Sequence, residues 1–431
     1  MSKKTTLFVP FEDHSMCLLC NSYMHLKSYP AKPVALSILR YYNLCMKYAE
    51  LLFKHTDAKP FPIDRHSLVF DKIYKKWVFT FKIKDEVIYS NTLSRLYAAI
   101  TTFFVKYNAS HYIFCVSLGS FKFADKNVYI FFDMLAYYVL KEAKFDFEVS
   151  ARYPETFDLQ SVGFQNTALH NFMINQQGVR YIENKTNFIN YYEQRLHLTN
   201  SWYRVSLTRA DLAMSDIASE ITTDIGCFLS NNKASDTTVE NMLNVVAELI
   251  SNTEHNDGDC ILDIDICAGF INVSFVNLFS GRMFDKLQEM FDADTLSPKA
   301  HEIIQAAIKY HAQHFTETYT QDDFYFISTF QEDITTRQEL SGGTGLTKII
   351  NVIAKEDENT YSYVLSGYNL LFLRKGFLGD GGKEIGFNNP NDYYYATPDK
   401  AVLSKCNLYI PGVAFQLIFK FEESIHATKT H

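Results

Sequence analysis

One stretch of the chain carries residue types that can handle water and a divalent cation. Glu248, Asn252 and His255 recur at i, i+4 and i+7, which places them on one face of a helix. A carboxylate can orient and deprotonate water, and an amide oxygen one turn later can ligate Mg²⁺, which prefers hard oxygen ligands. Most such faces are simply solvated, so this spacing alone predicts only an amphipathic helix.

A second signal is a glycine-rich run that leads directly into a helix. Glycines allow a backbone to approach a ligand closely, and the free N–H groups of a helix N-terminus suit a phosphate. Lys348, in the first turn of that helix, is either a phosphate ligand or a solvated cation. The run consists of Gly342, Gly343, Thr344, Gly345 and Leu346.

Together the two signals resemble the GHKL ATPase superfamily, which includes type II topoisomerase subunits, sensor histidine kinases, mismatch-repair ATPases and anti-sigma kinases. The resemblance covers about residues 206–421. It implies a two-layer helix and sheet sandwich that binds ATP and Mg²⁺. In the family's terms Glu248 is the general base that positions the attacking water, and Asn252 holds Mg²⁺. His255 would lie in the same pocket, and the glycine run 342–346 with Lys348 would meet the phosphates.

The sequence departs from this family where adenine is recognised. The family normally has an Asp followed by two spaced glycines, whereas here Asn277 stands at the place of the Asp and Gly281 is the remaining glycine. The Asn277 carbonyl can accept a hydrogen bond from the adenine amine without a charge, and therefore more weakly. The alternative is reduced nucleotide binding or a changed base preference. Residues 282–340 correspond to the family's ATP lid, which is long in this chain.

The elements that must position these residues divide the chain into two halves of an α+β protein. Residues 1–150 alternate strands with helices, which predicts an α/β regulatory or interaction domain with a faint resemblance to STAS-like domains. Residues 151–205 are expected to form a connector, and residues 206–431 the GHKL-like domain. Helices are expected at 31–55, 91–105, 206–229, from Thr237 or Thr238 to about 254, and from Ser297-Pro298 onward. Strands are expected at 77–83, 112–117, 127–132, 260–267, 271–277, 361–373 and 412–421.

Composition limits the class of protein. The chain has 431 residues, 47% of them apolar and 21% charged, which excludes a disordered or collagen-like chain. Lys and Arg number 41 against 49 Asp and Glu, so the net charge of −8 favours neither nucleic acid nor a membrane as partner. Without a long apolar run or a signal peptide, and with scattered cysteines, we expect a cytoplasmic protein.

Three functions remain open at this point. The first is an ATPase that uses its nucleotide state as a conformational switch, in a bacterial regulatory or phage-defence system, with a nucleotide-dependent homodimer or a co-encoded protein as partner. The second is a protein kinase of the histidine-kinase or anti-sigma type, for which His197 has the charged neighbourhood of a phosphoacceptor but lacks a coiled-coil pattern. The third is a non-catalytic scaffold that senses a nucleotide.

Two further clusters allow metal binding but have simpler interpretations. His14, Cys17, Cys20 and His25 offer four ligands of the types that zinc takes. The span is cramped, so buried thiols are the expected state. His311 and His314 could share a metal, but no third ligand lies at a telling distance, so surface histidines are expected.

Overall fold

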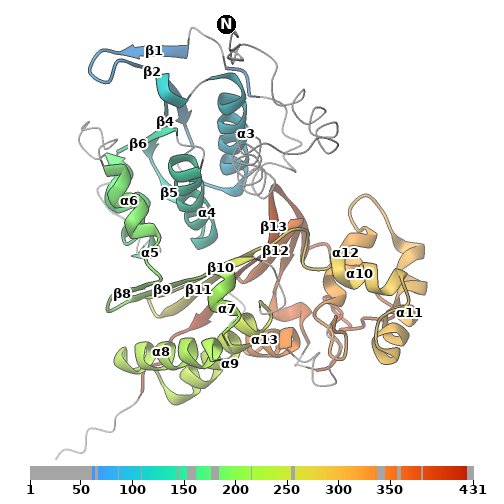
Figure 1. The fold of residues 1–431 in the computed structure, drawn as a ribbon. Coiled ribbons are helices and arrows are strands. Elements are labelled where there is room, and N and C mark those ends of the chain that lie inside the picture. Colours follow the sequence, from blue (N-terminus) through green and yellow to red (C-terminus); the bar gives the residue numbers. More distant parts are fainter. Residues whose placement is uncertain are drawn as a thin grey trace, which may run out of the picture.

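A computed structural model of the chain describes residues 61–63, 67–85, 87–107, 109–142, 145–152, 162–175, 184–214, 216–253, 258–336, 345–356, 361–379 and 382–424. Over these ranges the chain is a mixed α+β protein with one large sheet in each half (Figure 1). None of the helices in this part combines the length and apolar character needed to span a bilayer. The helix expected at 31–55 lies outside the described residues.

The N-terminal sheet has the order β1-β2-β4-β6-β7, with β1 antiparallel to β2 and the remaining pairs parallel. The aromatic side chains of these strands are buried on one face of the sheet, against α3 (Ser90–Lys106) and α4 (Lys126–Tyr137). The expected strands at 77–83 and 112–117 and the helix expected at 91–105 are confirmed. The strands are β1 (Leu68–Asp71), β2 (Lys76–Ile83), β4 (Tyr112–Ser120), β6 (Asp146–Arg152) and β7 (Ile174–Asn175), and the small pair β3 (Val87–Ile88) and β5 (Lys122–Phe123) lies beside them.

One predicted strand of this half is wrong. Residues 127–132 belong to the helix α4 (Lys126–Tyr137), whereas α3 spans Ser90–Lys106. The Asp125 side chain caps α4 by accepting a hydrogen bond from the Val128 N–H at 3.0 Å. Because nearly every residue of α4 is buried, its sequence lacks the polar face that marks a helix.

The interval predicted as a connector holds short elements that pack into the N-terminal core. Phe164, Leu169 and Phe188 are fully buried there. The elements are α5 (Val162–Gln165), a π-helical turn (Leu169–Met173), α6 (Lys185–Tyr192) and β8 (Leu196–Leu198).

The C-terminal sheet is antiparallel with the order β12-β13-β11-β10-β9-β8. The predicted hairpin is confirmed: Ala268 and Gly269, with φ of 51° and 82°, form the two-residue turn between β10 and β11. The strands at 361–373 and 412–421 are also confirmed, the second as part of a longer strand. The bounds are β9 (Trp202–Leu207), β10 (Asp259–Cys267), β11 (Phe270–Leu278), β12 (Tyr363–Phe372) and β13 (Leu403–Lys420).

Helices cover one face of this sheet, below it in Figure 1. The helix expected from residue 206 begins later, because Ser206 and Leu207 continue β9 in register with β10. The predicted helix opening at Ser297-Pro298 is confirmed, since the Ser297 hydroxyl accepts from the Ala300 N–H at 3.3 Å. The helices are α7 (Arg209–Leu212), α8 (Ile217–Asn231), α9 (Asp236–Ser251), α10 (Asp285–Asp292), α11 (Pro298–His311), α12 (Gln321–Ser328) and α13 (Gly345–Ile353).

The two halves share a core. Helix α4 lies on the face of the C-terminal sheet opposite α8, α9 and α13, so the sheet is the middle of three layers (Figure 1). Ile261, Val276 and Leu408 of that sheet belong to the same buried cluster as the helices of the N-terminal half. The charged side chains on this face of the sheet are therefore enclosed between the halves.

Candidate functional site

Helix α9 forms because its start is capped and its apolar residues face the core. Ser235, rather than Thr237 or Thr238, is the N-cap, and its hydroxyl accepts a hydrogen bond from the Thr238 N–H at 3.2 Å. The predicted apolar face is confirmed, with Val239 and Leu243 at its half-buried margin. The helix ends at Ser251, and its buried residues include Met242, Val246, Leu249 and Ile250.

The last turn of α9 carries Glu248 and is capped by Asn252. The Asn252 N–H donates to the Glu248 carbonyl at 3.1 Å, which closes the helix. Both side chains are half-buried. Glu248 and Asn252 therefore lie along one edge of the helix end, as the spacing predicted, whereas His255 lies outside the described residues.

Helix α13 brings Lys348 against this helix end. The Lys348 Nζ lies 2.8 Å from the Glu248 Oε1, and their side chains are 55% and 20% exposed. Thr347, the neighbouring residue, is buried and donates its hydroxyl to the Phe330 carbonyl at 2.8 Å, which fixes the first turn of α13. The predicted cation of the glycine run therefore pairs with the predicted general base.

The end of β11 lies at the same end of the helix layer. The chain leaves α9 after Asn252 and enters β10 at Asp259, which pairs with Leu278 of β11. Asn277 faces the helix layer and is fully buried, and its side-chain amide donates to the Asp259 carbonyl at 3.3 Å. The side-chain nitrogen of Asn277 is thus engaged by the protein backbone, which fixes the orientation of the amide.

Gly281 and Gly412 make the close approach at this end of the sheet possible. Gly281 has φ +100°, and its carbonyl accepts from the Gly412 N–H at 2.7 Å. Gly412 has φ +87°, and a Cβ there would lie 2.1 Å from the Asn277 carbonyl oxygen. Both glycines serve the backbone packing of β13 against β11.

Part of the predicted phosphate site cannot be placed. Gly342, Gly343 and Thr344 lie outside the described residues, as does the cluster His14, Cys17, Cys20 and His25. Gly345 opens α13, and Leu346 is half-buried against the core. Within the described ranges, no group of three or more metal-ligating side chains is found. Of the predicted catalytic and phosphate-binding residues, the structure therefore brings Glu248 and Lys348 into contact.

The predicted lid interval is helical and well packed over its described part, residues 282–336. Its helices contribute Leu287, Ile304 and Phe326 to the C-terminal core. The expectation of two surface histidines is wrong for His311, which is fully buried between the Tyr319 hydroxyl at 2.6 Å and the Tyr393 carbonyl at 2.8 Å. Both of its ring nitrogens are therefore occupied, and a metal shared with His314 is excluded.

A cavity of about 820 Å³ lies elsewhere, between α3 and the β12–β13 edge. Arg282 and Lys405 line it, and none of the predicted site residues does. Lys405 pairs with Asp323 at 2.7 Å, and Arg282 pairs with Asp285 at 2.7 Å. Because none of the residues predicted to bind nucleotide lines it, this cavity is a weaker candidate for the predicted phosphate site.

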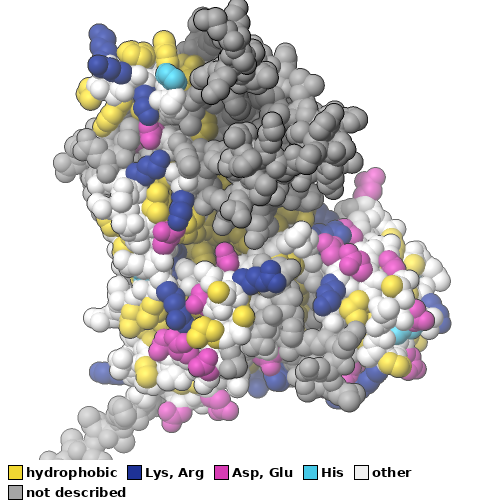
Figure 2. All heavy atoms as spheres, in the orientation of Figure 1, with side chains coloured by type: hydrophobic (Ala, Val, Ile, Leu, Met, Phe, Trp, Pro, Cys, Tyr) yellow, Lys and Arg dark blue, Asp and Glu magenta, His cyan; other side chains and the backbone are white. Residues whose placement is uncertain are grey.

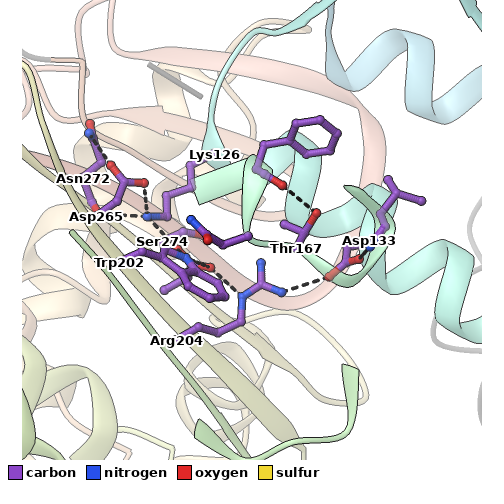
Figure 3. A network of polar contacts seen from close by, with 12 residues as sticks. Lys126, Asp133, Thr167, Trp202, Arg204, Asp265, Asn272 and Ser274 are labelled. Atoms are coloured by element: carbon purple, nitrogen blue, oxygen red, sulfur yellow. Dashed lines mark hydrogen bonds and ion pairs between the residues drawn. The ribbon is translucent and has the colours of Figure 1, made fainter. Parts of the chain in front are cut away.

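The interface between the halves holds a network of buried charges that the sequence did not reveal (Figure 3). On the inner side of α4, Lys126 meets Asp263 at 2.6 Å and Asp265 at 2.5 Å. Arg204 of β9 joins Asp263 at 2.6 Å to Asp133 of α4 at 2.9 Å. All five side chains are at most 4% exposed. Two cations and three carboxylates therefore tie three elements of both halves together.

The electrostatics of this network follow from burial and pairing. Burial opposes ionisation of Asp263, but Lys126 and Arg204 together hold the pKa of its carboxyl below the ordinary value. Burial raises the pKa of Asp133, and Arg204 only partly opposes that rise. Burial and the nearby Arg204 lower the pKa of His197 to about 4. His197 is buried on strand β8 between the rings of Tyr191 and Trp202, which is unlike an accessible phosphoacceptor.

A sequence signal for this network did exist. Asp263 and Asp265 alternate with apolar residues of β10, so they point away from the helix layer. In the sheet register Asp263 lies opposite Arg204 on one side and Ser274 on the other, which makes a polar row across the sheet. The sequence did not show that this row is buried, because α4, the helix that covers it, was predicted as a strand.

Comparison with known proteins gives no independent assignment. The chain matches no protein-family model, no curated protein and no solved structure.

Proposed function

We propose that the chain is an ATP-binding protein of the GHKL type that hydrolyses ATP with Mg²⁺. The observation that carries the proposal is the convergence at one end of the helix layer: the Glu248–Asn252 end of α9 lies against the first turn of α13, which follows the glycine run. An antiparallel sheet backs these helices.

The residues present fit the chemistry of Mg²⁺ and phosphate. Asn252 offers an amide oxygen at a half-buried helix end, and Mg²⁺ commonly takes few protein ligands and completes its shell with water and phosphate oxygens. Among the described residues, Lys348 is the only cation that pairs with Glu248. Bound Mg²⁺ would neutralise the phosphate charge, which a chain of net charge −8 cannot do by bulk basicity.

The Glu248–Lys348 pair supplies a switch that depends on the nucleotide. A terminal phosphate would compete with Glu248 for Lys348, because both are anions that accept from its ammonium group. Glu248 released from Lys348 can orient and deprotonate a water molecule, and loss of the terminal phosphate restores the pair. Because this pair joins α9 to α13, breaking and re-forming it would transmit the nucleotide state to the helix layer.

A second candidate is a scaffold that binds nucleotide without turnover. It is favoured by the same 2.8 Å pair, which holds the base on a cation, and by the uncharged Asn277 that bonds to the Asp259 backbone. The buried position of His197 does not favour the kinase alternative with this residue as phosphoacceptor.

Phosphate release from ATP distinguishes these candidates. We expect Mg²⁺-dependent hydrolysis by the wild type and a loss of about a hundredfold or more in kcat for Glu248→Gln. Glu240→Gln, an exposed carboxylate on the same helix, is the matched control and keeps wild-type activity. Binding without hydrolysis by the wild type would favour the scaffold, and absence of ATP binding would refute both.

A further inference from the structure

A β-hairpin at the edge of the N-terminal sheet exposes an unusual set of side chains. Strand β1 is the edge strand, and the turn after it joins β1 to β2. Ile73 in this turn is 84% exposed, and Trp77 in β2 is 42% exposed. Figure 2 shows hydrophobic and basic side chains together over this hairpin at the upper left. The hairpin tip, as used below, comprises Val69, Phe70, Lys72, Ile73, Lys75 and Trp77.

The hairpin tip is an ordered structure and not a frayed end. The Asp71 carboxylate accepts hydrogen bonds from the Ile73 N–H at 2.8 Å and the Tyr74 N–H at 3.0 Å, which locks the turn. The Phe70 and Trp77 rings meet edge to face at 5.2 Å between centroids. The fold therefore holds large apolar side chains in water, which calls for a partner surface.

The charge around these apolar groups is locally positive. Residues 68–77 contain three lysines and one aspartate, a sum of +2 in a chain whose total is −8. Lys76 pairs with Asp146. Lys72 and Lys75 are exposed and have no acidic partner within the described part of the chain. The expected lack of attraction to membranes followed from the total charge and does not describe this local surface.

We propose that the hairpin tip binds the surface of an anionic lipid bilayer. An indole ring favours the boundary between head groups and acyl chains, and an aliphatic side chain at a convex apex can enter that boundary. Lysines beside it meet anionic head groups. Ile73 and Val69 distinguish this surface from a nucleic-acid site, which rewards cations and aromatic rings but not exposed aliphatic groups.

The test is co-sedimentation of the full chain with vesicles of phosphatidylserine and phosphatidylcholine, compared with phosphatidylcholine alone. We expect binding to the anionic vesicles and about a fivefold lower partition coefficient for each lysine removed in Lys72→Gln and Lys75→Gln. Ile73→Asp should abolish binding. Leu198→Asp, at a 60% exposed apolar residue of β8, and Lys309→Gln, on α11, are the matched controls and should bind as the wild type does.

Tryptophan fluorescence gives a second readout. The chain has two tryptophans, and Trp202 is fully buried, so quenching by lipids with brominated acyl chains reports Trp77. Quenching that is lost in Ile73→Asp supports the proposal. Absence of vesicle binding, or binding that the tip variants leave unchanged, overturns it. Binding of poly-glutamate or of an oligonucleotide through the tip without binding of vesicles also overturns it, in favour of an acidic polymer. None of these outcomes depends on nucleotide binding at α9.

Discussion

Replacing Arg204 with methionine should destabilise the entire described fold, because Arg204 bridges two buried carboxylates from different halves. After the replacement Asp263 still has Lys126 at 2.6 Å. Asp133 keeps the hydrogen bond from the Leu169 N–H at 2.8 Å, but within the described residues it then has no cation as a partner. The cost therefore falls mainly on Asp133, a buried charge left without a counter-ion.

The expected size of this effect is about 3–5 kcal/mol, the cost of leaving one member of a buried ion pair alone. That is a large share of the roughly 5–15 kcal/mol by which domains are stable. A matched control exists in Arg195, which pairs with Glu220 at 2.9 Å while both side chains are over 40% exposed. Arg195→Met should cost less than about 1 kcal/mol, because exposed pairs contribute little.

The pH dependence identifies the carboxylate responsible. Burial already raises the pKa of Asp133, and Arg204 opposes that rise. Without Arg204 the folded-state pKa rises further above the unfolded value, so the folded variant takes up a proton more readily than the unfolded chain. The cost of Arg204→Met should therefore be larger at pH 8 than at pH 5, by about 1.4 kcal/mol for each unit of added pKa shift.

Urea unfolding, monitored by circular dichroism and fluorescence, measures the free energy of unfolding of each variant and its dependence on pH. We expect one cooperative transition for both halves, since they share a core. The double variant Arg204→Met/Asp133→Asn should recover most of the loss, because no buried charge is then left alone. A loss of stability for Arg204→Met no larger than that for Arg195→Met, or a larger loss at pH 5 than at pH 8, would contradict the bridging role of Arg204.

Three further predictions follow from single residues. Gly412→Ala should cost about 2–4 kcal/mol in urea unfolding because of its positive φ and the 2.1 Å clash, whereas Gly376→Ala, with no atom within 4 Å of the added Cβ, should cost less than about 1 kcal/mol. Lys348→Gln should weaken ATP binding about tenfold in calorimetry, whereas the exposed Lys355→Gln should leave it unchanged. His197 should titrate near pH 4 by NMR. Because its folded-state pKa lies below the ordinary 6.5, the unfolded chain takes up a proton first and the wild type loses stability as the pH falls from 6.5 to 4. His197→Phe should lose less stability over this range.

The elements with a clear period could be predicted from the sequence. The alternation of Asp263 and Asp265 with leucine and isoleucine predicted β10, and Ala268-Gly269 predicted its turn. Helix α4 could not be predicted, because burial on nearly all sides removes the polar face by which a helix is recognised. The error had a consequence, since α4 provides the partners that explain why two aspartates stand in a buried strand.

The candidate site was predictable only where one helix carries it. The spacing of Glu248 and Asn252 follows from helix geometry, and the structure places both at the end of α9. Glu248 and Lys348 are 100 positions apart in the sequence. Their pairing depends on how α13 packs on α9, and no local sequence pattern predicts that packing. The same holds for the inward orientation of Asn277.

The central claim, that ATP and Mg²⁺ bind at the end of α9, is tested most directly by calorimetric titration with a non-hydrolysable ATP analogue. We expect one saturable site whose affinity falls at least about tenfold when Mg²⁺ is omitted or Asn252 is changed to alanine. Asn244→Ala, at an exposed amide on the same helix, should bind as the wild type does. No saturable binding by the wild type, or equal affinity for Asn252→Ala and wild type, would contradict binding of ATP and Mg²⁺ at the end of α9.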